Sequence, residues 1–200
     1  MTDEAAPDRP DEPELPPYEG IAITAVRMVK TPAEAAAALT VLSAMDAIGF
    51  DTESKPTFMK GEVSTGPHLV QLATDEVAYL FQIVPGSAFD LMKPVLESRD
   101  IIKVGFGLQD DVKRMRAKLG IDMVNVLDLS TALRRKGERN TLGAKTAVAR
   151  FFGQKMQKSK KITTTNWAMP RLSEKQILYA ADDAHVALKI YRHWRSSSPA

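Results

Sequence analysis

Cysteine is missing from this chain of 200 residues. Without cysteine, neither a disulfide framework nor a zinc–thiolate site can form, and the absence fits a protein of the reducing cytoplasm. Long apolar runs are missing too: no stretch approaches the roughly 18 consecutive apolar residues of a membrane span. The acidic, proline-rich first residues differ from the basic and then apolar start of a signal peptide. We therefore expect a soluble, cytoplasmic protein.

Acidic and basic residues are unevenly distributed along the chain. Residues 1–20 contain seven acids and one arginine, whereas the remainder contains 26 basic and 18 acidic residues. The acidic, proline-rich segment of residues 1–20 can bury too little apolar area to become ordered. We therefore expect residues 1–20 to be a disordered, acidic, proline-rich tail and residues 21–196 to form one domain. The basic excess of that domain fits either an ordinary solvated surface or one that attracts a polyanion.

Hydrophobic periodicity and helix-end signals predict an α/β domain with a mixed sheet. Thr31, Pro32 and Glu34 form a capping box with proline in the first turn, which predicts a helix to about residue 45. Ser173 and Gln176 give the same signal for the last helix, which extends to residue 195. Strands are expected at 21–29, 47–53, 68–74, 77–83, 101–107 and 122–129, and further helices at 87–96, 108–120 and, in two pieces broken near Gly137, 130–151. The strands at 68–74 and 77–83 are expected to form a hairpin.

Two acids stand at the end of a strand that is otherwise apolar, in the stretch IGFDTES (residues 48–54). Because side chains alternate between the faces of a strand, Asp51 and Glu53 share one face and Thr52, with a structural role, points to the other. Two carboxylates this close raise each other's pKa unless a cation lies between them, and Mg²⁺ prefers such oxygen ligands. The pair alone indicates either a metal site or a solvated strand end.

Two further acidic stretches follow along the chain. Asp110 and Asp111 fall in the first turn of a predicted helix, where the helix dipole favours acids with or without a function. Tyr179 and Asp183 lie four residues apart on one face of the last helix. Asp182 points about 100° away from them and is expected to be solvated. Taken singly, the tyrosine fits a core aromatic residue and Asp183 fits an ordinary helical acid.

Together, the stretches FDTES, KVGFGLQDDVKRM and YAADDA resemble, in order and spacing, the three exonuclease motifs of the DEDDy-type 3′–5′ exonucleases. RNase D and the exonuclease domain of the Werner-syndrome helicase belong to that family. TGPHLVQLAT and NWAMPRLSEKQILYAADDA are similar to further stretches of it, so the resemblance extends over residues 45–192. It implies an RNase H-like α/β fold, in which helices flank a mixed sheet of five to six strands.

The resemblance also implies catalytic residues. The residues that match the three motifs are Asp51 and Glu53, then Asp111, and finally Tyr179 and Asp183. Asp110 is the competitor of Asp111 in the second motif. A sister group has histidine five residues before the last aspartate; Leu178 stands at that position, which indicates the tyrosine subgroup. His185 is then expected on the helix surface.

In such an enzyme two divalent ions, Mg²⁺ or Mn²⁺, would lie between the four carboxylates and the terminal phosphodiester. Asp51 would contact both ions, and Glu53 and Asp183 would complete the site that activates water. Asp111 would hold the second ion largely through water, and Tyr179 would orient the attacking water. The product would be a nucleoside 5′-monophosphate released from a 3′ end.

Two other functions stay open: a catalytically weak nucleic-acid-binding module that retains the fold, and a scaffold that binds a partner through the acidic tail. The presence of all four acids and the tyrosine favours the enzyme. Its expected substrate is single-stranded or 3′-recessed nucleic acid, either DNA or RNA.

A basic segment is the candidate track for this substrate. Residues 131–161 contain ten basic residues and one acid, and phosphate contacts supply most affinity that is independent of base sequence. The ordinary surface preference of lysine and arginine accounts for about half of these residues. The expected substrate contacts are Arg135, Lys158, Lys160 and Lys161, together with Phe58 and Lys60 from the loop after the first motif and Gln71 beside the site. Trp167 is expected to be a core residue rather than a base-stacking platform.

Overall fold

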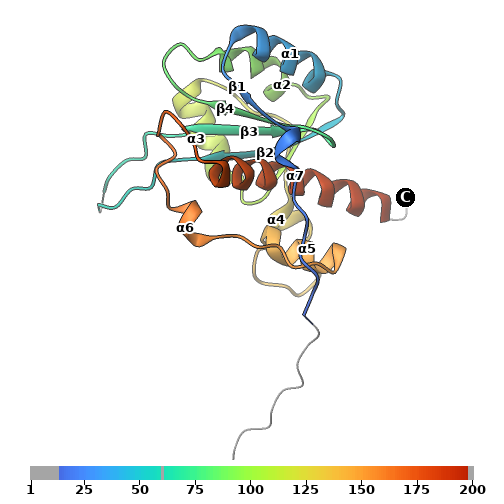
Figure 1. Ribbon diagram of the computed structural model, residues 1–200. Helices are drawn as coiled ribbons and strands as arrows, with labels where there is room; N and C mark the ends of the chain where they lie inside the picture. The colour runs from blue at the N-terminus through green and yellow to red at the C-terminus, as the bar shows by residue number, and fades with distance from the viewer. Residues whose placement is uncertain (1–13, 60, 198–200) are drawn as a thin grey trace, which may run out of the picture.

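The computed structural model describes residues 14–59 and 61–197 and contains a six-stranded sheet flanked by helices (Figure 1). In order across the sheet, the strands are β1 (Val26–Val29), β4 (Ala78–Gln82), β3 (Leu69–Ala73), β2 (Ala47–Glu53), β5 (Ile102–Gly105) and β6 (Val126–Asp128). β3 pairs antiparallel with both of its neighbours, and the other three strand pairs are parallel. The expected mixed sheet and the β3–β4 hairpin are therefore confirmed.

Helices form a layer on each face of the sheet (Figure 1). One face is covered by α1 (Pro32–Ser43), the short helices η2 (Ala88–Met92) and α2 (Lys93–Leu96), and α3 (Gln109–Leu119). The long helix α7 (Glu174–Ser197) crosses the other face, and α4 (Leu129–Ala132), α5 (Ala144–Phe152) and α6 (Lys160–Thr163) lie on its side of the sheet. No helix in the described ranges has the length and apolarity needed to cross a membrane.

Strand β2 takes part in the apolar layers on both faces. Ile48 and Phe50 are fully buried on the side of α1 and α3. On the other side, a Cβ on Gly49 would lie 1.9 Å from the carbonyl oxygen of Ala184, so only glycine allows α7 to approach this closely. This contact brings the middle of α7 against the end of β2 that carries the two acids.

The predicted capping boxes fix the starts of α1 and α7, which pack on opposite faces of the sheet that contains β2. At α1, the Thr31 amide donates to Glu34 Oε2 at 3.0 Å and the Glu34 amide donates to Thr31 Oγ1 at 3.2 Å. Before α7, the Ser173 amide donates to Gln176 Oε1 at 3.0 Å and the Gln176 amide donates to Ser173 Oγ at 3.3 Å. Both helix starts are thereby confirmed, because each reciprocal pair satisfies two backbone donors.

Three expected elements are wrong in extent. The strand expected at 122–129 is reduced to β6, Val126–Asp128, because Asn125 has a left-handed backbone conformation with φ 51°. Residues 23–25 form a 3₁₀ helix, η1 (Ile23–Ala25), so β1 begins only at Val26. The Ile21 amide donates to Asp182 on α7, and the Ile21 side chain is buried in a cluster that includes residues of β3 and β4. Residues 133–143 are not helical: Glu138 caps a turn at the Arg135 amide and forms an ion pair of 2.6 Å with Arg150, contacts that fix an irregular connection between α4 and α5.

The expectation of disorder for residues 1–20 is wrong for residues 14–20; residues 1–13 lie outside the described ranges. The Tyr18 amide donates to the Lys155 carbonyl at 3.0 Å, and the Lys155 amide donates to the Pro16 carbonyl at 2.8 Å. The Tyr18 ring stacks on Phe152, with 6.1 Å between the ring centroids. Paired backbone groups and a packed aromatic ring order this segment despite its acidic composition, and we call residues 14–21 the N-terminal strap.

Candidate active site

Three carboxylates meet where the end of β2 faces α7. Asp51 and Glu53 project from the α7 side of the strand, and Asp183 comes from the helix. One carboxylate oxygen from each of the three lies within 4.8 Å of the other two. We call these three residues the acid cluster. The close approach at Gly49 explains why residues 130 positions apart meet here, and it confirms that the first and third motifs converge.

Burial and mutual repulsion make the acid cluster costly to ionise. The pKa of Glu53 is raised to about 8, mainly by burial and then by Asp183. The pKa of Asp51 is raised well above its ordinary value by burial and then by the charges of Asp183 and Glu53. Because a divalent cation between the oxygens would relieve this repulsion, the donor set fits a hard metal ion such as Mg²⁺ or Mn²⁺.

Asp111 lies close to this cluster but is not part of it. Its buried Oδ1 accepts a hydrogen bond from Thr52 Oγ1 and pairs with Arg114 at 3.3 Å. Thr52 does point to the opposite face from Asp51, as expected, and its structural role is to hold this fourth carboxylate. Asp110 is exposed and pairs with Lys113 at 3.2 Å, so the choice of Asp111 as the inward-facing acid is supported by the geometry.

Tyr179 and Lys158 form the other wall of the site. The Tyr179 hydroxyl lies 2.9 Å from Thr163 Oγ1, and burial followed by the Asp183 charge raises the pKa of Tyr179. Lys158 Nζ contacts Asp183 and lies 5.5 Å from the centroid of the tyrosine ring. Burial alone would lower the pKa of Lys158, but Asp183 and then Tyr179 and Asp51 outweigh it and raise the pKa. A fixed positive charge therefore stands beside the acids.

The remaining expected substrate contacts are dispersed. Gln71 is fully buried opposite Asp51 on β3, and neither amide atom has a hydrogen-bond partner among the described residues. Phe58 is 81% exposed on the loop after β2. Arg135 is exposed between α4 and α5, and Lys161 is exposed on α6. Lys160 starts α6 without a described side chain, and Lys60 lies outside the described residues.

Two expectations for α7 are wrong and one core assignment is right. Asp182 is half-buried rather than solvated, and its Oδ1 accepts a hydrogen bond of 2.7 Å from the Ile21 amide. His185 is only 7% exposed, with Nε2 3.1 Å from the Asp75 carbonyl oxygen, because the β3–β4 turn covers this part of the helix. Trp167 is fully buried, as expected, and donates from Nε1 to the Thr163 carbonyl.

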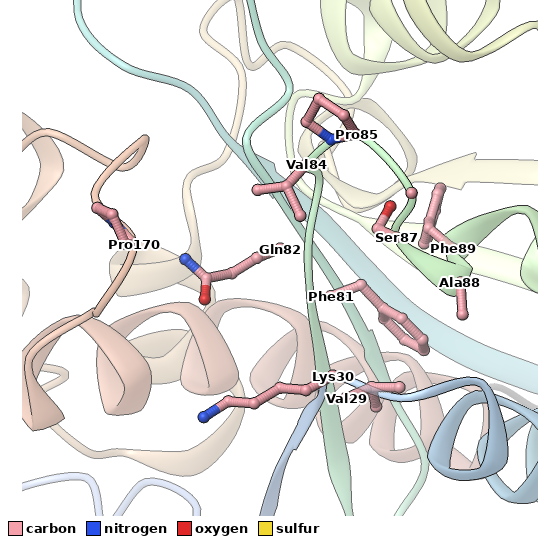
Figure 2. A pocket seen from close by; sticks show the side chains of 11 residues that line it. Val29, Lys30, Phe81, Gln82, Val84, Pro85, Ser87, Ala88, Phe89 and Pro170 are labelled. Carbon is pink, nitrogen blue, oxygen red and sulfur yellow. The ribbon is translucent and has the colours of Figure 1, made fainter.

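A separate pocket of about 320 Å³ lies at the C-terminal ends of the neighbouring strands β1 and β4 (Figure 2). Lys30 and Gln82 extend toward the side of the pocket on which Pro170 lies, and Phe81 and Val84 supply apolar surface. None of the residues that line it belongs to the three exonuclease motifs. It therefore contributes no group to the chemistry of the acid cluster.

Comparisons with known proteins agree with this arrangement. A family model described as 3′–5′ exonuclease matches residues 26–197. The mouse bifunctional 3′–5′ exonuclease/ATP-dependent helicase WRN is 30% identical over 153 residues, which are 76% of this chain and 11% of that protein. The chain thus spans a small part of this relative.

Two solved structures share the fold. The EXO domain of Aedes aegypti Nibbler superposes with a TM-score of 0.73 at 24% identity, covering 88% of this chain and 89% of that one. Trypanosoma brucei RNase D, solved in complex with RNA U12, superposes with a TM-score of 0.74 at 23% identity, covering 84% of this chain and 61% of that one. These similarities confirm the RNase H-like fold that the motifs implied.

Proposed function

The chain belongs to the 3′–5′ exonuclease family, and we propose that it hydrolyses the terminal phosphodiester bond at nucleic-acid 3′ ends and releases nucleoside 5′-monophosphates. The observation that carries this proposal is the meeting of Asp51, Glu53 and Asp183, with their carboxylate oxygens within 4.8 Å. Three acids that are partly buried at one point destabilise the fold, because each ionised group costs folding free energy there. A purely structural or solvated role therefore does not explain why they meet.

Divalent ions are the partners that such a set would hold. We assign Asp51, Glu53 and Asp183 as ligands of the first ion and Asp111 as the residue nearest a second, with Mg²⁺ or Mn²⁺ as the ion. When bound, the ions would lower the pKa of a water molecule and neutralise charge on the phosphate.

Side chains of the protein itself would orient the reactants. The Tyr179 hydroxyl, which lies 2.9 Å from Thr163 Oγ1, is protonated at neutral pH as any tyrosine is, and the upward shift of its pKa reinforces this, so it can position the attacking water. Lys158 lies where it can pair with the charged phosphate. In the reaction the water oxygen forms a bond to phosphorus and gives up a proton, the bond from phosphorus to the 3′ oxygen breaks, and that oxygen takes up a proton to become the 3′ hydroxyl of the shortened strand.

The substrate we propose is single-stranded or 3′-recessed DNA or RNA. Trypanosoma brucei RNase D was solved with RNA, which supports nucleic acid as the class of substrate. Phe58, exposed on the loop after β2, is proposed to stack on a terminal base, and Gln71 to contact the substrate or water beside Asp51. Arg135, Lys160 and Lys161 are proposed contacts further along the strand, and Lys60 is a proposed contact from the loop.

One observation favours the alternative of a weakly catalytic nucleic-acid-binding module. Two of the four acids already pair with basic side chains: Asp111 with Arg114, and Asp183 with Lys158. Cations must displace or share these contacts, which lowers metal affinity relative to unpaired acids. In this alternative the protein binds nucleic acid, and its cleavage is too slow to produce a ladder in the assay even when the metal is added.

Incubation of the pure protein with 5′-labelled DNA and RNA oligonucleotides, in Mg²⁺, Mn²⁺ or EDTA, separates these functions. A ladder that shortens from the 3′ end with either ion, and is absent in EDTA, supports the exonuclease. Binding without a ladder in all three conditions supports the alternative. The rate ratio between the DNA and RNA substrates assigns the preferred nucleic acid.

A further inference from the structure

A groove of about 550 Å³ runs beside the acid cluster and is lined by four lysines. These are Lys145, Lys155, Lys158 and Lys175, and we call the feature the lysine groove. Tyr179 also lines it, and Lys158 contacts Asp183, so the groove opens directly at the candidate active site. Its volume falls within the range of about 300–1,000 Å³ that is typical of ligand sites.

Basic side chains outnumber acidic ones among the residues that line the groove. Asp182 is the one acid among its lining residues, and its carboxylate already accepts the Ile21 amide. Lys175 is exposed and has no ion pair in the described part of the chain, and Lys145 donates to a neutral acceptor, the Lys158 carbonyl oxygen, at 3.2 Å. Lysine side chains gathered along one groove attract a polyanion such as a nucleic-acid backbone.

Two lysines of the groove already contact an acid: Lys158 contacts Asp183 of the acid cluster, and Lys155 contacts Glu14 of the N-terminal strap. Glu14 Oε1 lies 2.6 Å from Lys155 Nζ. The contact is positioned by the backbone, because hydrogen bonds from Tyr18 and to Pro16 pair the N-terminal strap with Lys155 on both sides. A carboxylate oxygen and a non-bridging phosphate oxygen make the same kind of charge-assisted hydrogen bond to an ammonium group.

We propose that the lysine groove binds the phosphodiester backbone of the substrate and that the Glu14 carboxylate occupies one phosphate position in it. The N-terminal strap and the nucleic acid then compete for Lys155. This inference rests on the proposed function, because it concerns the strand whose 3′ end reaches the acid cluster. It gives a role to the acidic segment that the catalytic chemistry leaves unused.

Equilibrium binding without cleavage tests the groove. The affinity of a 5′-fluorescein single-stranded oligonucleotide, in DNA and in RNA form, is measured in EDTA at several salt concentrations. Lys155→Gln and Lys175→Gln are each expected to weaken binding and to lower the magnitude of the salt slope by about 0.7. Lys118→Gln removes an exposed lysine of α3 and serves as the matched control. Groove variants that bind as tightly as the Lys118 variant overturn the proposal.

Competition by the strap is tested with a second pair of variants. Glu14→Gln is expected to tighten oligonucleotide binding about two- to five-fold, the range of an exposed ion pair. Glu19→Gln removes another exposed acid of the strap and should have a smaller effect. In the Lys155→Gln background the gain from Glu14→Gln should disappear, whereas in the Lys175→Gln background it should persist. Equal gains in both backgrounds contradict competition for Lys155.

These outcomes are distinguishable from a failure of the proposed function, because binding is measured without catalysis. If the protein binds nucleic acid through the groove lysines but never cleaves it, the proposal for the groove is supported and the proposed exonuclease function is rejected. If the protein cleaves nucleic acid but its groove variants bind as the wild type does, the exonuclease function is supported and the proposal for the groove is rejected. Circular dichroism and thermal unfolding verify that each variant is folded before its affinity is interpreted.

Discussion

Replacing Glu53 with glutamine is expected to stabilise the metal-free protein at alkaline pH. Burial and then the charge of Asp183 raise the pKa of Glu53 to about 8, against an ordinary value of 4.5. Since each pH unit of difference corresponds to about 1.36 kcal/mol, full ionisation of this carboxyl costs about 5 kcal/mol of folding free energy. Glutamine has nearly the same shape and removes the charge.

The sign of the effect follows from the two protonation states. Below pH 4.5 the carboxyl is protonated in both the folded and the unfolded chain, so it has no influence on stability. Between pH 4.5 and about 8 the unfolded chain releases its proton while the folded chain keeps it, so the wild-type free energy of unfolding falls as pH rises. Above about pH 8 the cost is complete.

Urea unfolding, followed by circular dichroism in EDTA, measures this difference. The Glu53→Gln variant should exceed the wild type by about 2–5 kcal/mol at about pH 9 and by less than about 1 kcal/mol at about pH 5, the lower bound allowing for relaxation of neighbouring groups. Glu76→Gln, at an exposed glutamate outside the acid cluster, is the control. If the stabilities of the Glu53 variant and the wild type change in parallel with pH, the reasoning about the cluster is refuted.

Three other predictions use different measurements. Mg²⁺ or Mn²⁺ should raise the melting temperature at pH 8, and at a hundred times the Kd the free energy of unfolding should increase by about 2.7 kcal/mol. Asp51→Asn should abolish this shift, and equal shifts in both proteins would place the ion elsewhere. Gly49→Ala should cost more than about 2 kcal/mol and reduce activity, because its Cβ meets the Ala184 carbonyl oxygen at 1.9 Å, whereas Gly143→Ala, whose Cβ meets nothing within 4 Å, should be tolerated. Trp167→Ala should cost about 3–5 kcal/mol in urea unfolding, since the side chain is fully buried; a cost below about 1 kcal/mol would contradict a core role.

Local sequence signals identified most of the fold. The capping boxes at Thr31 and Ser173 and the apolar runs of β2 to β5 depend on residues close together in the chain, so their patterns carry the information. The extent of β1 could not be predicted from local sequence patterns. The segment before β1 is held by a hydrogen bond from the Ile21 amide to Asp182, which lies 161 positions away in the chain.

The candidate site was predictable to a similar degree. The ordered motifs named Asp51, Glu53 and Asp183, and the geometry brings them together. The pairing of Asp111 with Thr52 and Arg114 was not predictable, because nothing in the spacing shows which way a carboxylate turns. The ordered structure of the N-terminal strap does not follow from its acidic, proline-rich composition. Its stability comes from backbone pairing with Lys155 and from the ring of Tyr18, which composition does not report.

The most direct test of the central claim identifies the product of the wild-type protein and of Asp51→Asn. An oligonucleotide labelled in its 3′-terminal nucleotide is incubated with Mg²⁺ or Mn²⁺, and the released material is separated by chromatography. We predict that the wild type and the exposed-acid control Asp110→Asn release labelled nucleoside 5′-monophosphate, and that Asp51→Asn, although folded, releases almost none. Substantial release by Asp51→Asn, or release of 3′-phosphorylated or longer products by the wild type, would contradict the assignment of the acid cluster as the centre of a 3′–5′ exonuclease.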